Sequence, residues 1–190
     1  MSPEVSRYDR LSILTHWVTA ALMIFMMIFG EALMGSGSEG EGFEEAGELA
    51  SGVLGPSIHV SLGAAILGLT VFRIAWRLAN PAPPYPPTLR RYEQMLARVT
   101  GAVFYLLLIG IPVTGWFAFS GYVAEEPAMA AVRLFGVMPL PPAPFRVQDA
   151  KDIHEIGGNV AILLTVLHVL AALKHQFIDR DGTLGRMLPH

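Results

Sequence analysis

The chain of 190 residues contains no cysteine. This absence excludes disulfide bonds, thiolate metal sites, iron–sulfur clusters and the Cys-x-x-Cys-His attachment of covalent haem. Any metal centre must therefore use histidine, methionine or carboxylate ligands. Charged residues are also scarce at 15% of the chain, whereas soluble domains carry about 25%. Together with 53% hydrophobic residues and a mean hydropathy of +0.48, this scarcity predicts an integral membrane protein.

Long uncharged runs predict the membrane-spanning segments, because a helix needs about 20 mainly apolar residues to cross a bilayer. We predict one all-α membrane domain over residues 1–190, a bundle of four transmembrane helices near residues 11–34, 56–78, 96–123 and 152–178. A signal peptide is the alternative interpretation of the first run. No small-residue cleavage site follows it promptly and it exceeds the usual length of a signal-peptide core, so we interpret it as a mature helix.

The connecting segments differ in composition. Residues 35–55 are rich in glycine and glutamate and contain no lysine or arginine, which predicts a solvated loop. Residues 80–87, NPAPPYPP, cannot propagate a helix and predict a stiff extended linker. Pro112 falls inside the third run, where we expect it to kink a helix. In the longer loop 125–150, residues 129–137 are compatible with an amphipathic surface structure.

The distribution of basic residues predicts the orientation. Ten of the thirteen lysines and arginines fall on one face of the predicted topology: Arg7, Arg10, Arg73, Arg77, Arg90, Arg91, Arg98, Lys174, Arg180 and Arg186. The other face holds Arg133, Arg146 and Lys151. By the positive-inside rule, both termini face the cytoplasm. In a bacterium the protein would lie in the inner membrane, with the two long loops in the periplasm.

Four histidines lie inside the apolar runs. His154 and His168 share the last run, and their spacing of fourteen residues places them about 21 Å apart along a helix axis. Fourteen residues make two heptads, so both side chains face the same side of a bundle. His16 lies near the cytoplasmic end of the first run and His59 near the periplasmic end of the second. By depth, the histidines form two pairs, His16 with His168 and His59 with His154.

Paired intramembrane histidines indicate a functional site, although a polar core residue is the alternative for each of them. Zinc or copper would need three or four protein ligands at one level, and only two histidines are available at each. Haem supplies four ligands to its own iron, so two imidazoles suffice. The core of a helix bundle is a common place for such a site. A membrane scaffold without haem remains the third interpretation.

Three segments carry a family resemblance: RYDRLSILTHW, GPSIHVSLG and DIHEIGGNVAILLTVLHVLAALKHQFIDRDGTLGRMLP. They resemble the bacterial cytochrome b561 family, whose members are four-helix membrane cytochromes with two b-type haems. The resemblance implies two non-covalent haem b groups. It also implies that His16 and His168 ligate the cytoplasmic haem iron, and that His59 and His154 ligate the periplasmic one.

An iron with two histidine ligands keeps no open position, so we expect outer-sphere electron transfer. Similarity to some family members suggests superoxide oxidation at the periplasmic face, with electrons passed to ubiquinone. A positive approach would steer the anion, and the candidates are Arg133, Arg146 and Lys151, unless these residues only cap and solvate the helix. The alternative is a non-enzymatic electron-transfer subunit that docks a periplasmic redox protein. The acidic residues 39–48 would then attract a basic partner.

The quinone site is less defined by the sequence. His175 could donate a hydrogen bond to a quinone carbonyl, or it could be a surface histidine. Arg10, Arg73, Arg77 and Lys174 are candidates for haem propionate or quinone contacts, although the positive-inside rule alone would also place basic residues there. The expected partners are the lipid bilayer, ubiquinone, and superoxide or a periplasmic redox protein. We expect no nucleic acid.

Overall fold

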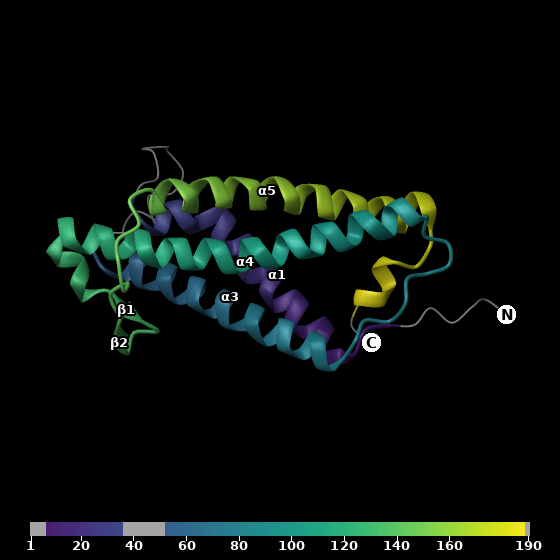
Figure 1. Ribbon diagram of the computed structural model, residues 1–190, viewed down its shortest axis with the longest axis horizontal. Coiled ribbons are helices and arrows are strands. Elements are labelled where there is room, and N and C mark those ends of the chain that lie inside the picture. Colours follow the sequence, from purple (N-terminus) through teal and green to yellow (C-terminus); the bar gives the residue numbers. More distant parts are fainter. Residues whose placement is uncertain (1–6, 36–51, 189–190) are drawn as a thin grey trace.

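The computed structural model describes residues 7–35 and 52–188, and its main elements are four long helices (Figure 1). They are α1 (Arg10–Leu33), α3 (Leu54–Ala79), α4 (Arg91–Glu125) and α5 (Ala150–Lys174). Each is long and apolar enough to cross a membrane, which confirms the predicted four-helix membrane bundle. A π-helical turn, η2 (His175–Asp179), continues α5, and a 3-10 turn, η3 (Leu184–Met187), follows.

The connector between α4 and α5 contains short elements. A 3-10 turn, η1 (Pro127–Ala131), precedes an antiparallel pair of two-residue strands, β1 (Arg133–Leu134) and β2 (Met138–Pro139). The sequence indicated a surface structure in this region but not a hairpin. By contrast, residues 81–86 form neither helix nor strand, as their prolines predicted.

Local capping sets two helix boundaries. At α1, the Asp9 carboxylate accepts a hydrogen bond from the Ser12 backbone N–H at 2.9 Å. At α4, the Glu93 carboxylate accepts one from the Arg90 backbone N–H at 3.0 Å, so the helix begins five residues before the predicted boundary. Pro112 lies within α4 without ending it.

The helices pack as a chain of neighbours. Helix α1 packs against α3, α3 against α4, and α4 against α5. Over the described residues, α5 does not pack closely against α1 or α3. Figure 1 shows α5 and α3 along opposite sides of the bundle. Side chains on the inner face of α5 therefore meet α1 and α3 across the interior.

The two ends of the bundle differ. One end, here the hairpin end, carries β1, β2 and η1 (Figure 1). The other, the terminal end, holds both ends of the described chain, because the Tyr8 N–H donates to the Arg186 carbonyl at 3.3 Å. There the Arg186 side chain also donates to the Pro84 carbonyl at 2.8 Å. The two termini thus lie on the same side, as predicted, and the assignment of that side to the cytoplasm remains a prediction.

The outer surface is apolar, as lipid contact requires. Large aliphatic side chains such as Leu106 and Leu163 are 72% and 61% exposed. Buried hydroxyls on the inside bond to their own helices; Thr19 Oγ1, for example, donates to the Thr15 carbonyl at 2.7 Å. This internal pairing avoids unsatisfied polar groups inside the membrane.

Candidate functional site: two imidazole pairs

At the hairpin end, α3 and α5 each contribute one imidazole to a shared site. The ring centroids of His59 and His154 lie 6.0 Å apart, with an angle of 55° between the ring planes. Each ring is oriented by a backbone carbonyl. His59 Nδ1 lies 3.0 Å from the Gly30 oxygen, and His154 Nδ1 lies 2.8 Å from the Ile111 oxygen.

These contacts assign the protons on both rings. A carbonyl oxygen only accepts hydrogen bonds, so Nδ1 of each neutral ring must carry the proton. The Nε2 atoms of His59 and His154 then keep a free lone pair. This is the tautomer in which histidine binds a metal, with the second nitrogen fixed by a hydrogen bond.

Two glycines make room for these rings. A Cβ added at Gly115 of α4 would lie 2.8 Å from Cε1 and 2.9 Å from Nδ1 of His154, closer than real side chains approach. A Cβ added at Gly30 of α1 would lie 3.6 Å from Cε1 of His59, an ordinary contact. Gly115 therefore decides where His154 can sit, whereas Gly30 acts mainly through its carbonyl.

At the terminal end, α1 and α5 contribute the second pair. The ring centroids of His16 and His168 lie 6.5 Å apart, with an interplanar angle of 66°. Phe104 of α4 meets the His168 ring edge-on at 5.4 Å. The structure thus brings together both histidine pairs predicted from depth.

The orientation of His16 differs from that of the other pair. Its Nδ1 lies 3.4 Å from Arg73 Nη2, and a guanidinium only donates hydrogen bonds. In this contact the proton of neutral His16 lies on Nε2. Metal binding through Nε2 would require the proton to move to Nδ1 and the contact with Arg73 to open.

The spacing of both pairs fits a metal ion between two imidazoles. Two rings on opposite sides of one ion, with metal–nitrogen bonds of about 2.0 Å, place their centroids about 6 Å apart. The measured 6.0 and 6.5 Å agree with this geometry. Two ligands per level do not complete a zinc or copper site, whereas they complete the coordination of a haem iron.

A small polar cavity adjoins the His16 pair. Its volume is about 40 Å³, and Arg73, Arg77 and Tyr105 contribute to its walls. The Arg73 guanidinium carbon lies 5.9 Å from the centre of the Tyr105 ring, and that of Arg77 lies 5.2 Å from the centre of the Tyr8 ring. Two of the predicted propionate or quinone residues, Arg73 and Arg77, therefore converge here. Arg10 is exposed at the start of α1.

An apolar groove lies between α3 and α4 at the same end. Its volume is about 480 Å³, and its walls are formed by Ile74, Arg77, Leu78, Ala102, Tyr105, Leu106 and Ile109. Leu78 and Leu106 are 80% and 72% exposed, so the groove opens toward lipid. Tyr105 and Arg77 border both the groove and the polar cavity.

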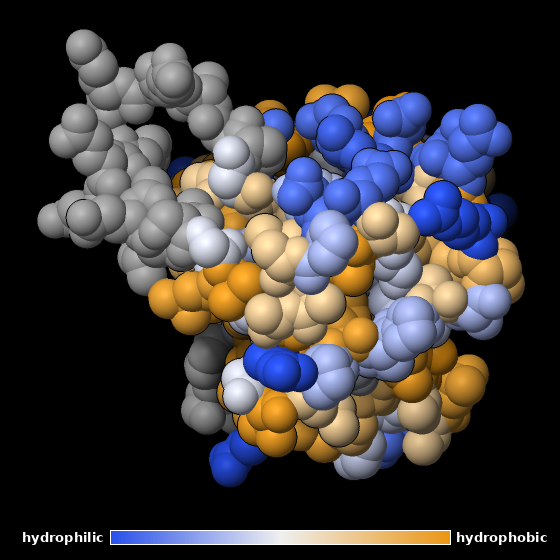
Figure 2. Space-filling model, turned by 90° about the vertical axis from the view of Figure 1, so that its left-hand side faces the viewer, coloured by the Kyte–Doolittle hydropathy of each residue, from blue (hydrophilic) through white to orange (hydrophobic). Residues whose placement is uncertain are grey.

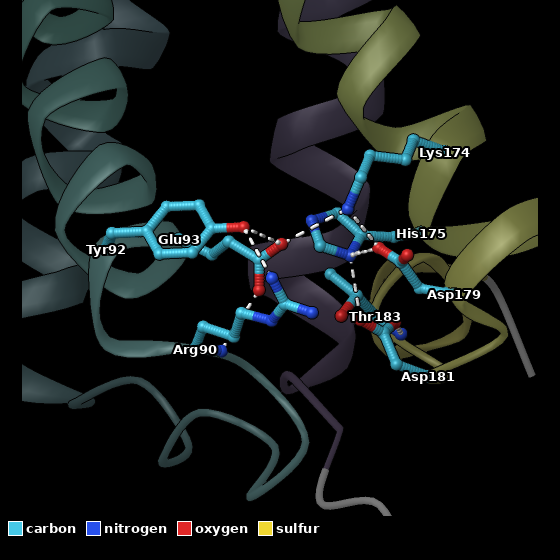
Figure 3. A network of polar contacts seen from close by, with 8 residues as sticks. All are labelled: Arg90, Tyr92, Glu93, Lys174, His175, Asp179, Asp181 and Thr183. Carbon is cyan, nitrogen blue, oxygen red and sulfur yellow. Dashed lines mark hydrogen bonds and ion pairs between the residues drawn. The ribbon is translucent and has the colours of Figure 1, made fainter.

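Lys174 and His175, the remaining predicted site residues at this end, belong to a polar network (Figure 3). Lys174 Nζ lies 3.1 Å from a Glu93 oxygen and also bonds to Asp179. His175 Nδ1 lies 2.7 Å from Asp181 and 3.0 Å from Asp179. Glu93, His175 and Asp179 are close enough to hold a metal ion, but the Lys174 ammonium bonds two of their carboxylates. The network ties the start of α4 to the end of α5.

Removing the Asp181 carboxylate is expected to destabilise this end in a pH-dependent way. Burial alone would raise the Asp181 pKa, but hydrogen bonds from Thr183 and His175 outweigh it and lower the pKa below 3.8. A lowered folded-state pKa stabilises the fold above pH 3.8 and ceases to do so as the pH falls through the folded value. We expect Asp181→Asn to cost about 1 kcal/mol at neutral pH. Thermal unfolding between neutral and acidic pH should show the difference shrinking; a constant difference would contradict it.

The candidates for superoxide steering lie at the hairpin end but are not equivalent. Lys151 precedes His154 by one helical turn on α5 and pairs with Glu155 at 3.7 Å. The Arg133 backbone N–H donates to Ser57 Oγ. Ser57 lies about 200° around the axis of α3 from His59, so Arg133 lies on the side of α3 that faces away from the imidazole pair. Neither Arg133 nor Arg146 has an ion pair within residues 7–35 and 52–188. The acidic segment 39–48 lies outside the described residues.

Several site residues were missed by the sequence analysis. The sequence analysis assigned no site residue to the third helix, yet the Ile111 carbonyl orients the His154 ring and Gly115 makes room for it. Their role depends on the packing of α4 against α5, for which the sequence has no local signal. Tyr105 was also missed, because its place beside Arg73 depends on the packing of α3 against α4.

Comparison with known proteins identifies relatives of this chain. The family profile described as "Prokaryotic cytochrome b561" matches residues 7–190. The chain is 28% identical to "Cytochrome b561 homolog 2" of Escherichia coli K12 over 98% of this chain and 93% of that protein. It is 33% identical to "Probable superoxide oxidase CybB" of Yersinia pestis over 70% and 73%. The profile covers nearly all of the chain, including both histidine pairs, and the chain therefore belongs to the prokaryotic cytochrome b561 family.

Proposed function

We propose that this membrane electron-transfer protein binds two haem b groups and carries single electrons from superoxide at the hairpin end to ubiquinone at the terminal end. The observation that carries the proposal is the pair of imidazole spacings, 6.0 and 6.5 Å, at two depths of one bundle. Membership of the family implies haem b. The donor set of paired neutral imidazoles, without thiolate or carboxylate, suits it.

The histidines would ligate one haem at each end. His59 and His154 would bind the first through Nε2, because their Nδ1 protons are held by backbone carbonyls. His16 and His168 would bind the second. When bound, haem supplies reversible one-electron oxidation and reduction. Because two histidines would hold each haem iron, a substrate would exchange electrons without binding to the iron.

Arg73 would have a second role at the terminal end. Iron binding by His16 requires the contact at 3.4 Å to open, and this frees the guanidinium. A free guanidinium beside a small polar cavity would suit a propionate carboxylate. Arg77, on the same cavity wall, would serve the same anion.

Superoxide would be steered by local positive charge near His154, because Glu125, Glu126, Asp149, Asp152 and Glu155 make the hairpin end acidic as a whole. Lys151 lies one turn above His154 and is 79% exposed, where its charge can attract an anion. Arg146 is exposed in the preceding loop. The positions of these two residues favour them over Arg133, which lies on the other side of α3. A relative described as a probable superoxide oxidase also supports this substrate.

The α3–α4 groove is a better quinone site than His175. His175 already bonds to two carboxylates, whereas the groove is apolar and opens to lipid, where a quinone dissolves. Tyr105 connects the groove to Arg73, which contacts His16. In the complete reaction, two superoxide ions would give up one electron each, and one quinone would take up both electrons and two protons to form the quinol.

Stopped-flow mixing of the oxidised, haem-loaded protein with superoxide would test the function. We expect rapid haem reduction that slows with salt and with Lys151→Glu, followed by re-oxidation on adding ubiquinone. Leu106→Trp should fill the groove and slow re-oxidation only, while Leu163→Trp on the lipid face of α5 serves as the control.

Two results would contradict this proposal. Slow, salt-insensitive reduction by superoxide would contradict the enzyme and favour an electron-transfer subunit that docks a periplasmic redox protein. Equal re-oxidation of the Leu106→Trp and Leu163→Trp proteins would exclude the groove as the quinone site.

A further inference from the structure

The connector between α4 and α5 folds back along the outside of α3. The Arg133 N–H donates to Ser57 Oγ at 3.0 Å, and the Phe135 N–H donates to Ser61 Oγ at 2.7 Å. Ser57 and Ser61 are the fourth and eighth residues of α3. The hairpin β1–β2 therefore runs beside the first two turns of a spanning helix, rather than beyond its end.

This position sets the depth of the hairpin in the bilayer. Helix α3 has 26 residues, so it is about 39 Å long. A hydrocarbon core of about 30 Å leaves about 4 to 5 Å of the helix outside at each end. Ser61 lies about 10 Å from the helix start. The hydrogen bond to Phe135 thus falls below the boundary between headgroups and acyl chains.

The tip of the hairpin is apolar and uncovered. Phe135, Val137 and Met138 are 60%, 83% and 53% exposed. Figure 2 looks onto this end and shows hydrophilic residues gathered above, toward α5, with more hydrophobic surface below, on the side of the hairpin. Three adjacent exposed apolar side chains are costly in water and favourable in acyl chains.

The backbone of the hairpin is suited to such an environment. The two strands pair, with Arg133 opposite Pro139 and Leu134 opposite Met138, and the Val137 N–H donates to the Leu134 carbonyl at 3.1 Å. These bonds and the two serine bonds satisfy part of the hairpin backbone; because open strand edges do not occur within the hydrocarbon region, the outer edges of the strands must face the headgroups while the apolar side chains reach the acyl chains.

The turn is held in an unfavourable conformation. Phe135 has φ +52° and Gly136 has φ +71°. Glycine adopts this region freely, but a bulky aromatic residue rarely does. The two serine bonds and the buried Val132, 1% exposed, hold the turn in place. The turn therefore keeps the Phe135 side chain at the surface, where it is 60% exposed.

We propose that the β1–β2 hairpin is inserted in the membrane, with Phe135, Val137 and Met138 among the acyl chains of the adjacent leaflet. Arg133, at the start of β1, reaches the lipid phosphates. The occupant of this surface is lipid, and the hairpin fixes the height of the His59–His154 pair in the bilayer. This inference does not depend on the identity of the electron donor or acceptor.

Because the chain has no cysteine, a single label can measure the depth of the hairpin. A nitroxide on Val137→Cys, in haem-loaded protein in phosphatidylcholine–phosphatidylglycerol vesicles, should collide with dissolved oxygen more than with a water-soluble nickel chelate. Leu163→Cys on the lipid face of α5 should behave the same way. Ala128→Cys in η1, beyond the end of α4, should show the opposite preference. Chelate access at Val137 equal to that at Ala128 would overturn the proposal.

A second variant tests the anchor. Adding Ser61→Ala to the Val137→Cys protein removes the acceptor of the Phe135 N–H, so chelate access should increase several-fold. Ser120→Ala, which removes the hydroxyl acceptor of the Ala143 N–H elsewhere in the connector, is the matched control. Unchanged depth in the Ser61→Ala protein would show that this bond does not hold the hairpin in the membrane.

Discussion

Replacing His154 with alanine is expected to remove one of the two proposed haems and to leave the other. His154 faces His59 at 6.0 Å, whereas His16 and His168 form a separate pair at 6.5 Å. Loss of the His154 imidazole should therefore leave the His16–His168 pair intact, because that pair lies about 21 Å away along α5. The haem content of the purified protein, measured as the pyridine haemochrome, should fall by half.

The other histidines complete this test. His59→Ala should give the same spectrum as His154→Ala, and His16→Ala and His168→Ala should share a different one. His175→Ala should retain both haems, because His175 bonds to Asp179 and Asp181 outside both pairs. Equal haem loss in all four pair variants would contradict the pairing.

Replacing Gly115 with alanine is the second large effect that we expect. In a helix interior, alanine normally stabilises relative to glycine by about 1 kcal/mol. Here the new methyl group would lie 2.8 Å from His154 Cε1, so the imidazole must move from its bond with Ile111. Disturbing the groups that orient a ligand typically weakens metal affinity by about 10- to 100-fold. Haem titration of the apoprotein should show one weakened site.

Gly121→Ala provides a matched control on the same helix. A Cβ at Gly121 meets no atom of the described chain within 4 Å, so both haem affinities should stay unchanged. A Gly115→Ala protein that binds both haems with the affinities of the Gly121→Ala protein would show that the His154 ring is not held where we describe it.

The sequence alone determined the membrane class, the four helices and the histidine pairs. Apolar runs of spanning length leave few alternatives to helices, because a lipid environment requires internal backbone pairing. The depth of each histidine follows from its position within its run, since the helical rise is constant. Even the shared orientation of His154 and His168 could be predicted, because their spacing is close to a whole number of turns.

Only the tertiary structure decided which groups surround the histidines. The carbonyls of Gly30 and Ile111 and the close approach of Gly115 depend on how α1 and α4 are rotated about their axes. Packing sets that rotation, and no local pattern encodes it. The same holds for His175, whose Nδ1 meets two carboxylates that the turn after α5 brings beside it; its role as a quinone donor stays a prediction. The hairpin depends on serines of α3 that lie more than seventy residues away in sequence, so its place beside α3 could not be predicted from its own residues.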